Sequence, residues 1–134
     1  METKFFIDSN VLLYTLGHDA RKLGKAKDLV NQRPVISVQT LNEFANVCRK
    51  KFKLEWADTS AGLETAKSLC DVVPLTIAGH ERAVEIASLN RIGIFDANII
   101  AAAELSGCNV LYTEDLNHGQ KIGRVSIVNP FVAK

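Results

Sequence analysis

Short apolar runs that alternate with longer amphipathic segments constrain the fold of this chain more than any other feature. The runs lie at residues 4–7, 34–37, 72–75, 110–113 and 125–128 and are typical of buried strands. Segments with the helical spacing of apolar residues separate the first four runs. Strands joined by helices pair in parallel, and the helices then cover both faces of the sheet. We therefore expect an α/β fold, a three-layer α/β/α sandwich around a central, mostly parallel sheet of four to five strands.

The helical segments are marked by apolar spacing and by capping residues. Ser9 is the expected N-cap of the first helix and Thr76 that of the fifth, which ends at Asn90. Residues 114–124 are polar and contain two glycines, so we expect a loop there. The first helix is expected over 10–16, and the remaining helices over 20–31, 41–53, 57–69 and 95–105.

Length and charge limit the classes of protein to consider. A chain of 134 residues fits one domain, expected over 1–134. The 16 Lys and Arg against 15 Asp and Glu give a net charge of +1, so any nucleic-acid site must be a local basic patch. No run reaches the ~18 apolar residues of a membrane span, and Asp8 interrupts the first apolar run too early for a signal sequence. We expect a cytoplasmic protein.

Several kinds of functional site are excluded by motif. The eight glycines form neither a dinucleotide-binding fingerprint nor a phosphate-binding loop. The three cysteines lack the paired spacing of a zinc site, and their odd number argues against a disulfide framework. The single tryptophan, Trp56, flanks a helix, which favours packing in the core or at its rim over base stacking.

Four acidic residues occupy positions from which they can meet at one edge of the sheet. Asp8 ends the first expected strand and Asp115 follows the fourth, so both lie at the carboxyl edge, where open α/β sheets bind ligands. Glu43 lies in the first turns of the helix after the second strand, and Asp96 opens a very apolar helix. Four separate segments would then contribute one acid each.

Each of these acids also has an ordinary structural explanation. Residues 40–43 (TLNE) match a capping box, Asp8 and Asp96 could each cap a helix, and Asp115 could form an Asx turn. However, Asp8 and Asp96 stand in very apolar surroundings, where an uncompensated carboxylate is costly. Clustered acids require a cation, and oxygen ligands alone favour Mg²⁺ or Mn²⁺. Such an ion indicates phosphoester chemistry.

The segments that carry these acids resemble PIN-domain ribonucleases, especially the VapC toxins of toxin–antitoxin pairs. The similar segments are FFIDSNVLLY, SVQTLNEF, GIFDANIIAAAELSGC and VLYTEDLNHG, which span nearly the whole chain. The last two are the most specific, because the family's third acid stands in an aromatic-Asp-Ala helix start and its fourth in a Thr/Ser-Glu-Asp-Leu-x-His-Gly loop.

The resemblance implies a metal-dependent endoribonuclease that hydrolyses RNA phosphodiesters with Mg²⁺ or Mn²⁺. It makes Asp8, Asp96 and Asp115 metal-binding or water-orienting carboxylates. Glu43 is then the remaining member of a catalytic acidic quartet.

The resemblance also implies supporting residues and partners. Asn10 and Thr113 match positions that hold carboxylates and metal waters, whereas Glu114 is expected to point away from the metal or to help the loop fold. An antitoxin protein would lie across the active-site groove, and the toxin would be a homodimer. The local cations that are candidates for RNA binding are Arg49, Lys50, Lys51 and Lys53 at a helix end, and Lys121 and Arg124 beside the acidic loop.

Three alternatives remain open. A phosphatase of the haloacid-dehalogenase type would use Asp8 as its nucleophile, but Asn10 stands where its general acid is expected. A catalytically silent PIN-like module would only bind RNA or a protein. A free-standing RNA-processing nuclease would share the acidic quartet but have no antitoxin.

Overall fold

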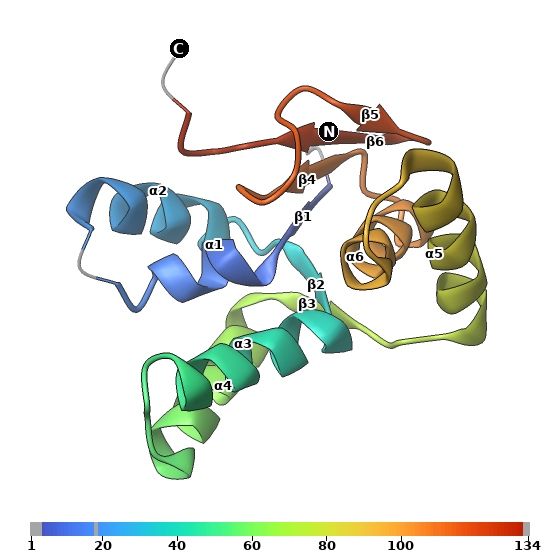
Figure 1. The fold of residues 1–134 in the computed structure, drawn as a ribbon. Coiled ribbons are helices and arrows are strands. Elements are labelled where there is room, and N and C mark those ends of the chain that lie inside the picture. The colour runs from blue at the N-terminus through green and yellow to red at the C-terminus, as the bar shows by residue number, and fades with distance from the viewer. Residues whose placement is uncertain (1–3, 18, 133–134) are drawn as a thin grey trace.

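The computed structural model describes residues 4–17 and 19–132, and its strands form one sheet. The strand order is β3-β2-β1-β4-β6-β5 (Figure 1). Neighbouring strands pair in parallel except β5, which is antiparallel to β6. The strands are β1 (Phe5–Ile7), β2 (Val35–Ser37), β3 (Asp71–Val73), β4 (Val110–Tyr112), β5 (Lys121–Ile122) and β6 (Val125–Val128).

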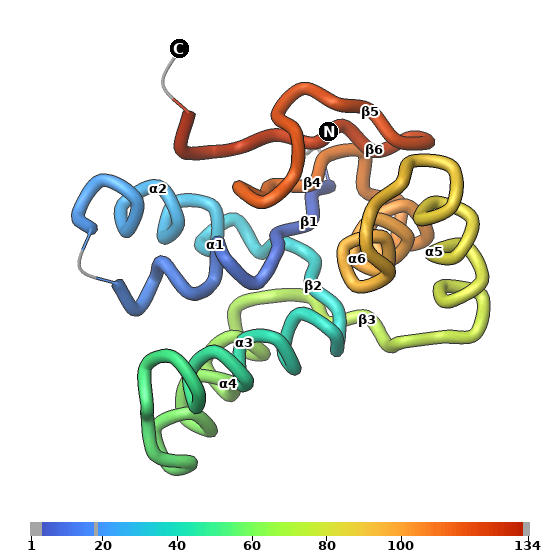
Figure 2. The backbone as a smooth tube through the Cα atoms, viewed as in Figure 1, coloured from blue at the N-terminus to red at the C-terminus, as the bar shows by residue number. Residues whose placement is uncertain are grey.

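Helices cover both faces of this sheet, as the sequence predicts. Figure 1 shows α5 and α6 on one side of the strands, and α1 and α2 on the other. Helices α3 and α4 lie side by side and complete the second helical layer (Figure 2). The expected three-layer α/β/α sandwich is thereby confirmed. The helices are α1 (Ser9–Tyr14), α2 (Ala20–Val30), α3 (Val38–Lys50), α4 (Trp56–Leu69), α5 (Ile77–Asn90) and α6 (Ile94–Leu105).

A row of apolar side chains across four strands forms the floor of one hydrophobic core. In register, these residues are Val35, Phe6, Leu111 and Ile127. All four are buried against α5 and α6, whereas the next residue of β1, Ile7, faces the second core. Alternate residues of the central strands therefore pack against opposite helical layers, and this period of two fixes the register of the sheet.

The polar segment after β4 differs from the prediction of a loop because it contains β5, which makes the sheet six-stranded. Only Ile122 of this two-residue strand is buried, so the sequence pattern is too short to predict it. Gly123 connects β5 to β6 with a positive φ of 59°. A Cβ atom there would collide with the carboxylate of Glu104, so both the backbone conformation and the space at this turn favour glycine.

Two helix starts also differ from the predicted ones. Helix α1 begins at Ser9 and is capped by Asp8, not by Ser9. Helix α3 begins directly after β2, and its capping box is formed by Ser37 and Thr40. The predicted capping box at residues 40–43 is therefore wrong, because Glu43 lies beyond the first turn of α3. The predicted cap of the fifth helix agrees with the structure, because Thr76 caps α5, whereas α6 has Gly93 and not Asp96 at its N-cap.

In the part of the chain that the structure describes, no single helix is both long and apolar enough to cross a membrane; only α5 and α6 taken together reach that length, across a bend of 120°. The three cysteines, Cys48, Cys70 and Cys108, are buried and free, as expected.

The burial of Val125 predicts a matched pair of stability measurements. Val125 of β6 is 0% exposed, whereas Val132 near the end of the described chain is 48% exposed. Val125→Ala should lower the free energy of unfolding by about 1.5–3 kcal/mol, because it removes buried methyl groups and leaves a cavity. Val132→Ala should change it by less than about 0.5 kcal/mol. Urea denaturation of both variants tests this, and equal losses would contradict the assignment of the core.

Candidate functional site

The first and fourth strands bring two polar residues together at the carboxyl edge of the sheet. Ile7 and Tyr112 are in register, so the residues that follow them, Asp8 and Thr113, are neighbours. The backbone N–H of Asp8 donates to the carbonyl of Tyr112 over 3.0 Å. Thr113 Oγ1 donates to Asp8 Oδ2 over 2.9 Å. The expected position of Asp8 at this edge is thus the observed one.

Asp8 is a buried carboxylate with two hydrogen bonds. The backbone N–H of Ser9 donates to Oδ1 over 2.7 Å, so Asp8 also caps α1. The pKa of Asp8 is raised to about 7, mainly by burial and in smaller part by the negative charges of Glu43 and Asp115, while the hydrogen bonds from Thr113 and Ser9 act in the opposite direction. The capping role and a place in an acidic cluster therefore coexist.

Glu43 faces this cluster from α3 and does not cap its helix. Ser9 Oγ donates to its Oε1 over 3.2 Å, and Gln39 Nε2 donates to its Oε2 over 3.3 Å. Partial burial raises the pKa of Glu43, and the charges of Asp96 and Asp115 add to that rise. Ser9 and Gln39 were not predicted as site residues. The spacing of Gln39, one helical turn before Glu43, was the available signal.

Asp96 and Asp115 complete the acidic cluster. Asp96 lies in the first turn of α6, and no described residue donates a hydrogen bond to its carboxylate, so it is not the N-cap. Partial burial raises the pKa of Asp96, and the charge of Asp115 contributes. Asp115 is exposed, and its backbone N–H donates to Thr113 Oγ1 over 3.1 Å. The structure thus brings all four predicted acids within electrostatic reach of one another.

The Thr113 hydroxyl connects three parts of the site. It donates its proton to Asp8 and accepts from the backbone of Asp115 and from Asn10 Nδ2, the latter over 3.1 Å. Thr113 is fully buried, so this hydroxyl makes all its hydrogen bonds with protein groups. Asn10 Oδ1 is also buried, and no described residue donates to it. That oxygen remains available for a further donor or a cation.

In the described part of the chain, Asp8, Glu43 and Asp96 form no ion pair with a basic side chain. No basic side chain contributes to the pKa of Asp8, Glu43 or Asp96. The available donor atoms are carboxylate, amide and hydroxyl oxygens, which suit Mg²⁺ or Mn²⁺. Within residues 4–17 and 19–132, however, no three His, Cys, Asp or Glu side chains are arranged to hold one metal ion by themselves.

Glu114 points away from the acidic cluster, into a separate ion pair. Tyr14 Oη donates to its Oε1 over 2.5 Å, and Lys22 Nζ donates to its Oε2 over 3.1 Å. Lys22 also lies 4.6 Å from the centroid of the Tyr14 ring. These contacts anchor the loop that carries Asp115. The partners, Tyr14 and Lys22, were not predicted, because they are distant from Glu114 in the sequence.

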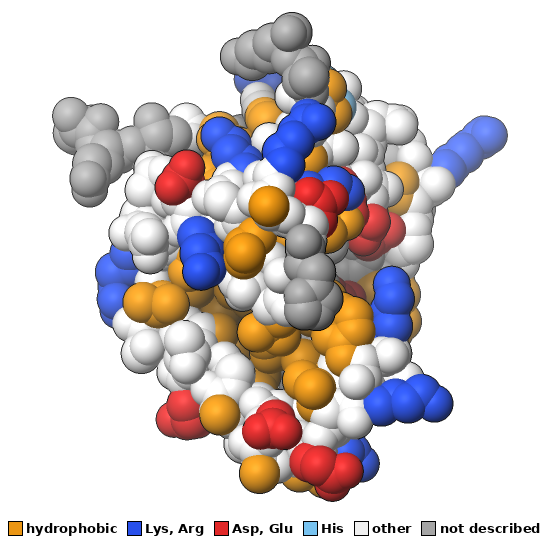
Figure 3. All heavy atoms as spheres, turned by 90° about the vertical axis from the view of Figure 1, so that its left-hand side faces the viewer, with side chains coloured by type: hydrophobic (Ala, Val, Ile, Leu, Met, Phe, Trp, Pro, Cys, Tyr) orange, Lys and Arg blue, Asp and Glu red, His pale blue; other side chains and the backbone are white. Residues whose placement is uncertain are grey.

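A groove of 370 Å³ extends from the cluster toward the end of α3. Asn10 and Asp115 line one part of it, and Lys51 and Phe52 line another. A second groove, of 450 Å³, is mostly apolar and lies between α1, α2, α3 and α4. Figure 3 shows hydrophobic side chains gathered on this side of the molecule.

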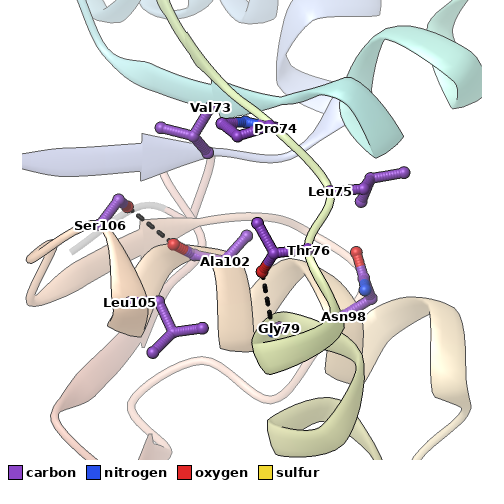
Figure 4. A pocket seen from close by; sticks show the side chains of 9 residues that line it. All are labelled: Val73, Pro74, Leu75, Thr76, Gly79, Asn98, Ala102, Leu105 and Ser106. Carbon is purple, nitrogen blue, oxygen red and sulfur yellow. Dashed lines mark hydrogen bonds between the residues drawn. The ribbon is translucent and has the colours of Figure 1, made fainter.

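A third hollow, of 250 Å³, lies between the segment that links β3 to α5 and helices α5 and α6. Figure 4 shows the hydrogen bond that Thr76 Oγ1 accepts from the backbone N–H of Gly79 over 2.9 Å, and Asn98 also lines the hollow. The Asn98 Oδ1 atom is buried and has no described partner. No carboxylate lines this hollow, so it is separate from the acidic cluster.

The predicted basic residues lie in two different places. Arg49, Lys50 and Lys51 lie where α3 ends, and Lys53 follows them; Lys51 lines the groove next to Asp115. Lys121 and Arg124 do not lie beside the acids, which corrects the prediction. Lys121 pairs with Ser126 at the start of β6, and Arg124 precedes β6. The β5–β6 hairpin therefore carries both to the amino edge, opposite the acidic cluster.

Comparison with known proteins relates this arrangement to one family. Residues 5–122 match the model of the PIN domain. A toxin–antitoxin complex from Klebsiella pneumoniae is similar in structure, with a TM-score of 0.71 and 21% identity over 96% of this chain and 98% of that one. DNA-bound VapBC from Salmonella typhimurium also has a TM-score of 0.71, with 24% identity over 94% and 97% of the two chains.

A third similar structure is VapC20 from Mycobacterium tuberculosis, described as a sarcin-ricin loop cleaving toxin. Its TM-score is 0.61, with 21% identity over 84% of this chain and 90% of that chain. No curated protein matches the chain by sequence.

The buried acids predict that metal-free protein loses stability as the pH rises. The folded-state pKa of Asp8, about 7, exceeds its ordinary value of 3.8, so between these values the folded protein binds more protons than the unfolded protein. The free energy of unfolding should therefore fall from pH 5 to pH 8, by about 2.5 kcal/mol from Asp8 alone. The raised pKa values of Glu43 and Asp96 act in the same direction.

Urea unfolding in chelator-containing buffers at several pH values measures this dependence. Asp8→Asn should flatten it, whereas Asp28→Asn, which alters an exposed carboxylate of α2, should leave it unchanged. A stability that rises from pH 5 to pH 8 would contradict the assignment.

Proposed function

The chain belongs to the PIN domain family, and on that premise we propose that it is a metal-dependent endoribonuclease, the toxin of a VapBC-type toxin–antitoxin pair. The observation that carries this proposal is the meeting of four carboxylates, from four separate segments, at the carboxyl edge of the sheet. Neighbouring carboxylates help to raise the pKa values of Asp8, Glu43 and Asp96, and no described basic side chain forms an ion pair with these three acids. Such a cluster favours binding of a cation that also binds phosphate oxygens.

The donor set fits Mg²⁺ or Mn²⁺. Mg²⁺ keeps several waters and needs only one or two protein carboxylates in addition to substrate phosphate oxygens, which agrees with the lack of a closed set of three acidic ligands. Asp8, Asp96 and Asp115 would hold the ion directly or through its waters, and Asn10 Oδ1 offers a further acceptor. When bound, the ion polarises the phosphodiester and lowers the pKa of the attacking water.

The protein's own groups would orient the reacting atoms. Thr113 and Ser9 each occupy one hydrogen-bonding position on a different oxygen of Asp8, so the carboxylate is fixed while each oxygen keeps a free lone pair. Asn10 fixes the Thr113 hydroxyl in turn. These residues act as supports that hold the carboxylate in one orientation.

Asp96 and Glu43 would handle the attacking water. The Asp96 carboxylate has no described donor, and its raised pKa makes it a better proton acceptor than an ordinary aspartate. Glu43 is held by Ser9 and Gln39, so its position relative to Asp96 is defined. One of the two orients the water and the other accepts its proton.

RNA would approach along the groove that joins Asp115 to Lys51. Lys51, with Arg49 and Lys50 at the same helix end, would contact phosphates on one side of the scissile bond. Lys121 and Arg124 lie at the opposite edge, so they would contact only an RNA long enough to pass around the domain.

An antitoxin segment is the proposed occupant of the apolar groove between α1, α2, α3 and α4. Leu12 and Leu16 line this groove and give it an apolar wall. The similar structures from Klebsiella and Salmonella are toxin–antitoxin complexes, which supports such a partner.

A homodimer would cover exposed apolar residues of α5 and α6, such as Leu89 and Phe95, which are 79% and 66% exposed. A cytoplasmic location agrees with the free cysteines.

A free-standing RNA-processing nuclease is the second candidate, because the acidic cluster would serve it equally well. The two differ in the partner: a toxin requires a small antitoxin reading frame next to its gene. Co-expression of that frame should abolish the RNA cleavage and growth inhibition that the toxin causes, whereas a processing nuclease would have no such inhibitor.

Cleavage of RNA tests the proposed activity directly. Antitoxin-free protein should cleave members of a mixed RNA panel with Mg²⁺ or Mn²⁺ and not with EDTA. Asp8→Ala and Asp96→Ala should each lower the rate by about 100-fold or more, because an electrostatic contact to the reacting centre is lost. The exposed-acid control Asp28→Asn should retain full activity. Cleavage that persists in EDTA, or that survives both alanine substitutions in folded protein, would overturn the proposal.

A further inference from the structure

Trp56 is unusually exposed for a tryptophan. It is the first residue of α4, and 60% of its side chain is accessible to solvent. Packing in the core, which its position in the sequence allowed, is therefore wrong, whereas a place at the rim agrees with the structure. Large exposed aromatic side chains are enriched where proteins bind partners, because they provide much contact area with few rotamers.

Arg49 holds this ring in a defined position. Its guanidinium lies 4.7 Å from the centroid of the Trp56 ring, and its Nη1 donates to the carbonyl of Leu54 over 2.7 Å. The second contact anchors the arginine to the segment that joins α3 to α4, which Figure 2 shows at the end of the two helices remote from the sheet. A guanidinium covers one face of an indole, and the exposure of Trp56 leaves much of the ring free.

A hollow of 520 Å³ adjoins this aromatic platform. Along α3 it is lined by Asn42, Asn46, Arg49 and Lys50, and no acidic residue is among the described residues that line it. Asn42, Asn46 and Arg49 recur at helical spacing, so their side chains form one stripe. The hollow thus combines an aromatic face, two amide side chains and two cations.

This combination fits an unpaired nucleobase better than an acidic peptide. Unpaired bases stack on aromatic rings and guanidinium planes, and their edges form hydrogen bonds with amide side chains. Arginine and lysine contact the neighbouring phosphates. An acidic peptide would use the cations but would leave the indole ring and the two amides without matching groups.

The hollow also lies close to the proposed reaction centre. Asn42 precedes Glu43 directly, and Arg49 follows Glu43 by six residues, which is about 9 Å along the helix axis. We propose that Trp56, Arg49, Asn42 and Asn46 form a subsite for one unpaired base of the RNA substrate, a short distance along the strand from the bond that is cleaved. This inference rests on the proposed nuclease function and adds to it a determinant of substrate choice.

The tryptophan fluorescence of this protein reports binding at the proposed subsite, because Trp56 is the only tryptophan of the chain. The test uses antitoxin-free protein with Asp96→Asn, in EDTA, so that RNA binds without being cleaved. Titration with a short single-stranded RNA should quench the tryptophan fluorescence with saturation. An abasic strand of the same length, which supplies the phosphates without the bases, should not. Equal quenching by both strands, or none by either, would overturn the subsite.

Substitutions measured with fluorescently labelled RNA give a second test. Trp56→Ala should weaken RNA binding by about 5-fold to 100-fold, the range expected for loss of one stacked base. Trp56→Phe should recover most of that affinity. Lys67→Ala, an exposed charge on the same helix but remote from the hollow, should change affinity by less than about 2-fold. In protein with an intact Asp96, Trp56→Ala should raise KM far more than it lowers kcat.

The outcomes separate this inference from the proposed function. Metal-dependent cleavage with affinity and KM unchanged by Trp56→Ala would overturn the subsite and leave the nuclease intact. Base-dependent quenching without cleavage of any RNA would support base binding at Trp56 and overturn the nuclease. Loss of antitoxin binding with unchanged RNA binding would overturn the subsite in favour of a protein contact.

Discussion

The hydrogen bond from Thr113 to Asp8 is the interaction on which the site depends. It joins the ends of two neighbouring parallel strands, and the same hydroxyl accepts hydrogen bonds from Asn10 on α1 and from the backbone of Asp115 in the acidic loop. One buried oxygen atom therefore fixes the relative positions of two segments, residues 8–10 and 113–115, that are distant in the sequence. Because Asp8 is buried and its pKa is raised to about 7, a cation at the proposed metal site would compete with a proton for this carboxylate at neutral pH.

The rest of the fold makes this unfavourable cluster of charges tolerable. The row of apolar residues that runs across the sheet through Phe6 and Leu111 holds the strand ends in register, so the residues that follow each strand are positioned by the core. Helix α6 packs closely because its buried side chains are small or aliphatic, and its first turn presents Asp96 at the same edge. Local repulsion at the functional site is thus offset by packing elsewhere.

The sequence predicts the parts of the site that follow from strand ends and misses those that depend on tertiary contacts. Asp8 and Asp115 are placed correctly because a parallel sheet brings carboxyl ends together. The role of Glu43 is ambiguous in sequence and is resolved only when Ser37 and Thr40 are seen to form the capping box. Lys121 is misplaced because the short antiparallel strand β5 reverses the chain, and two residues carry too little pattern to predict a strand.

Uptake of a divalent ion is the most direct test of the claim that the clustered acids form a metal site. Calorimetric titration of folded, antitoxin-free protein with Mn²⁺ in buffers of different ionisation enthalpy measures both binding and proton release. The account predicts saturable binding that releases a fraction of a proton near pH 6.5, because Asp8 is then partly protonated, and much less at pH 9. Asp8→Asn should remove the proton release and weaken binding. Folded protein that binds no ion, or that binds it equally well without the Asp8 carboxylate, would contradict the account.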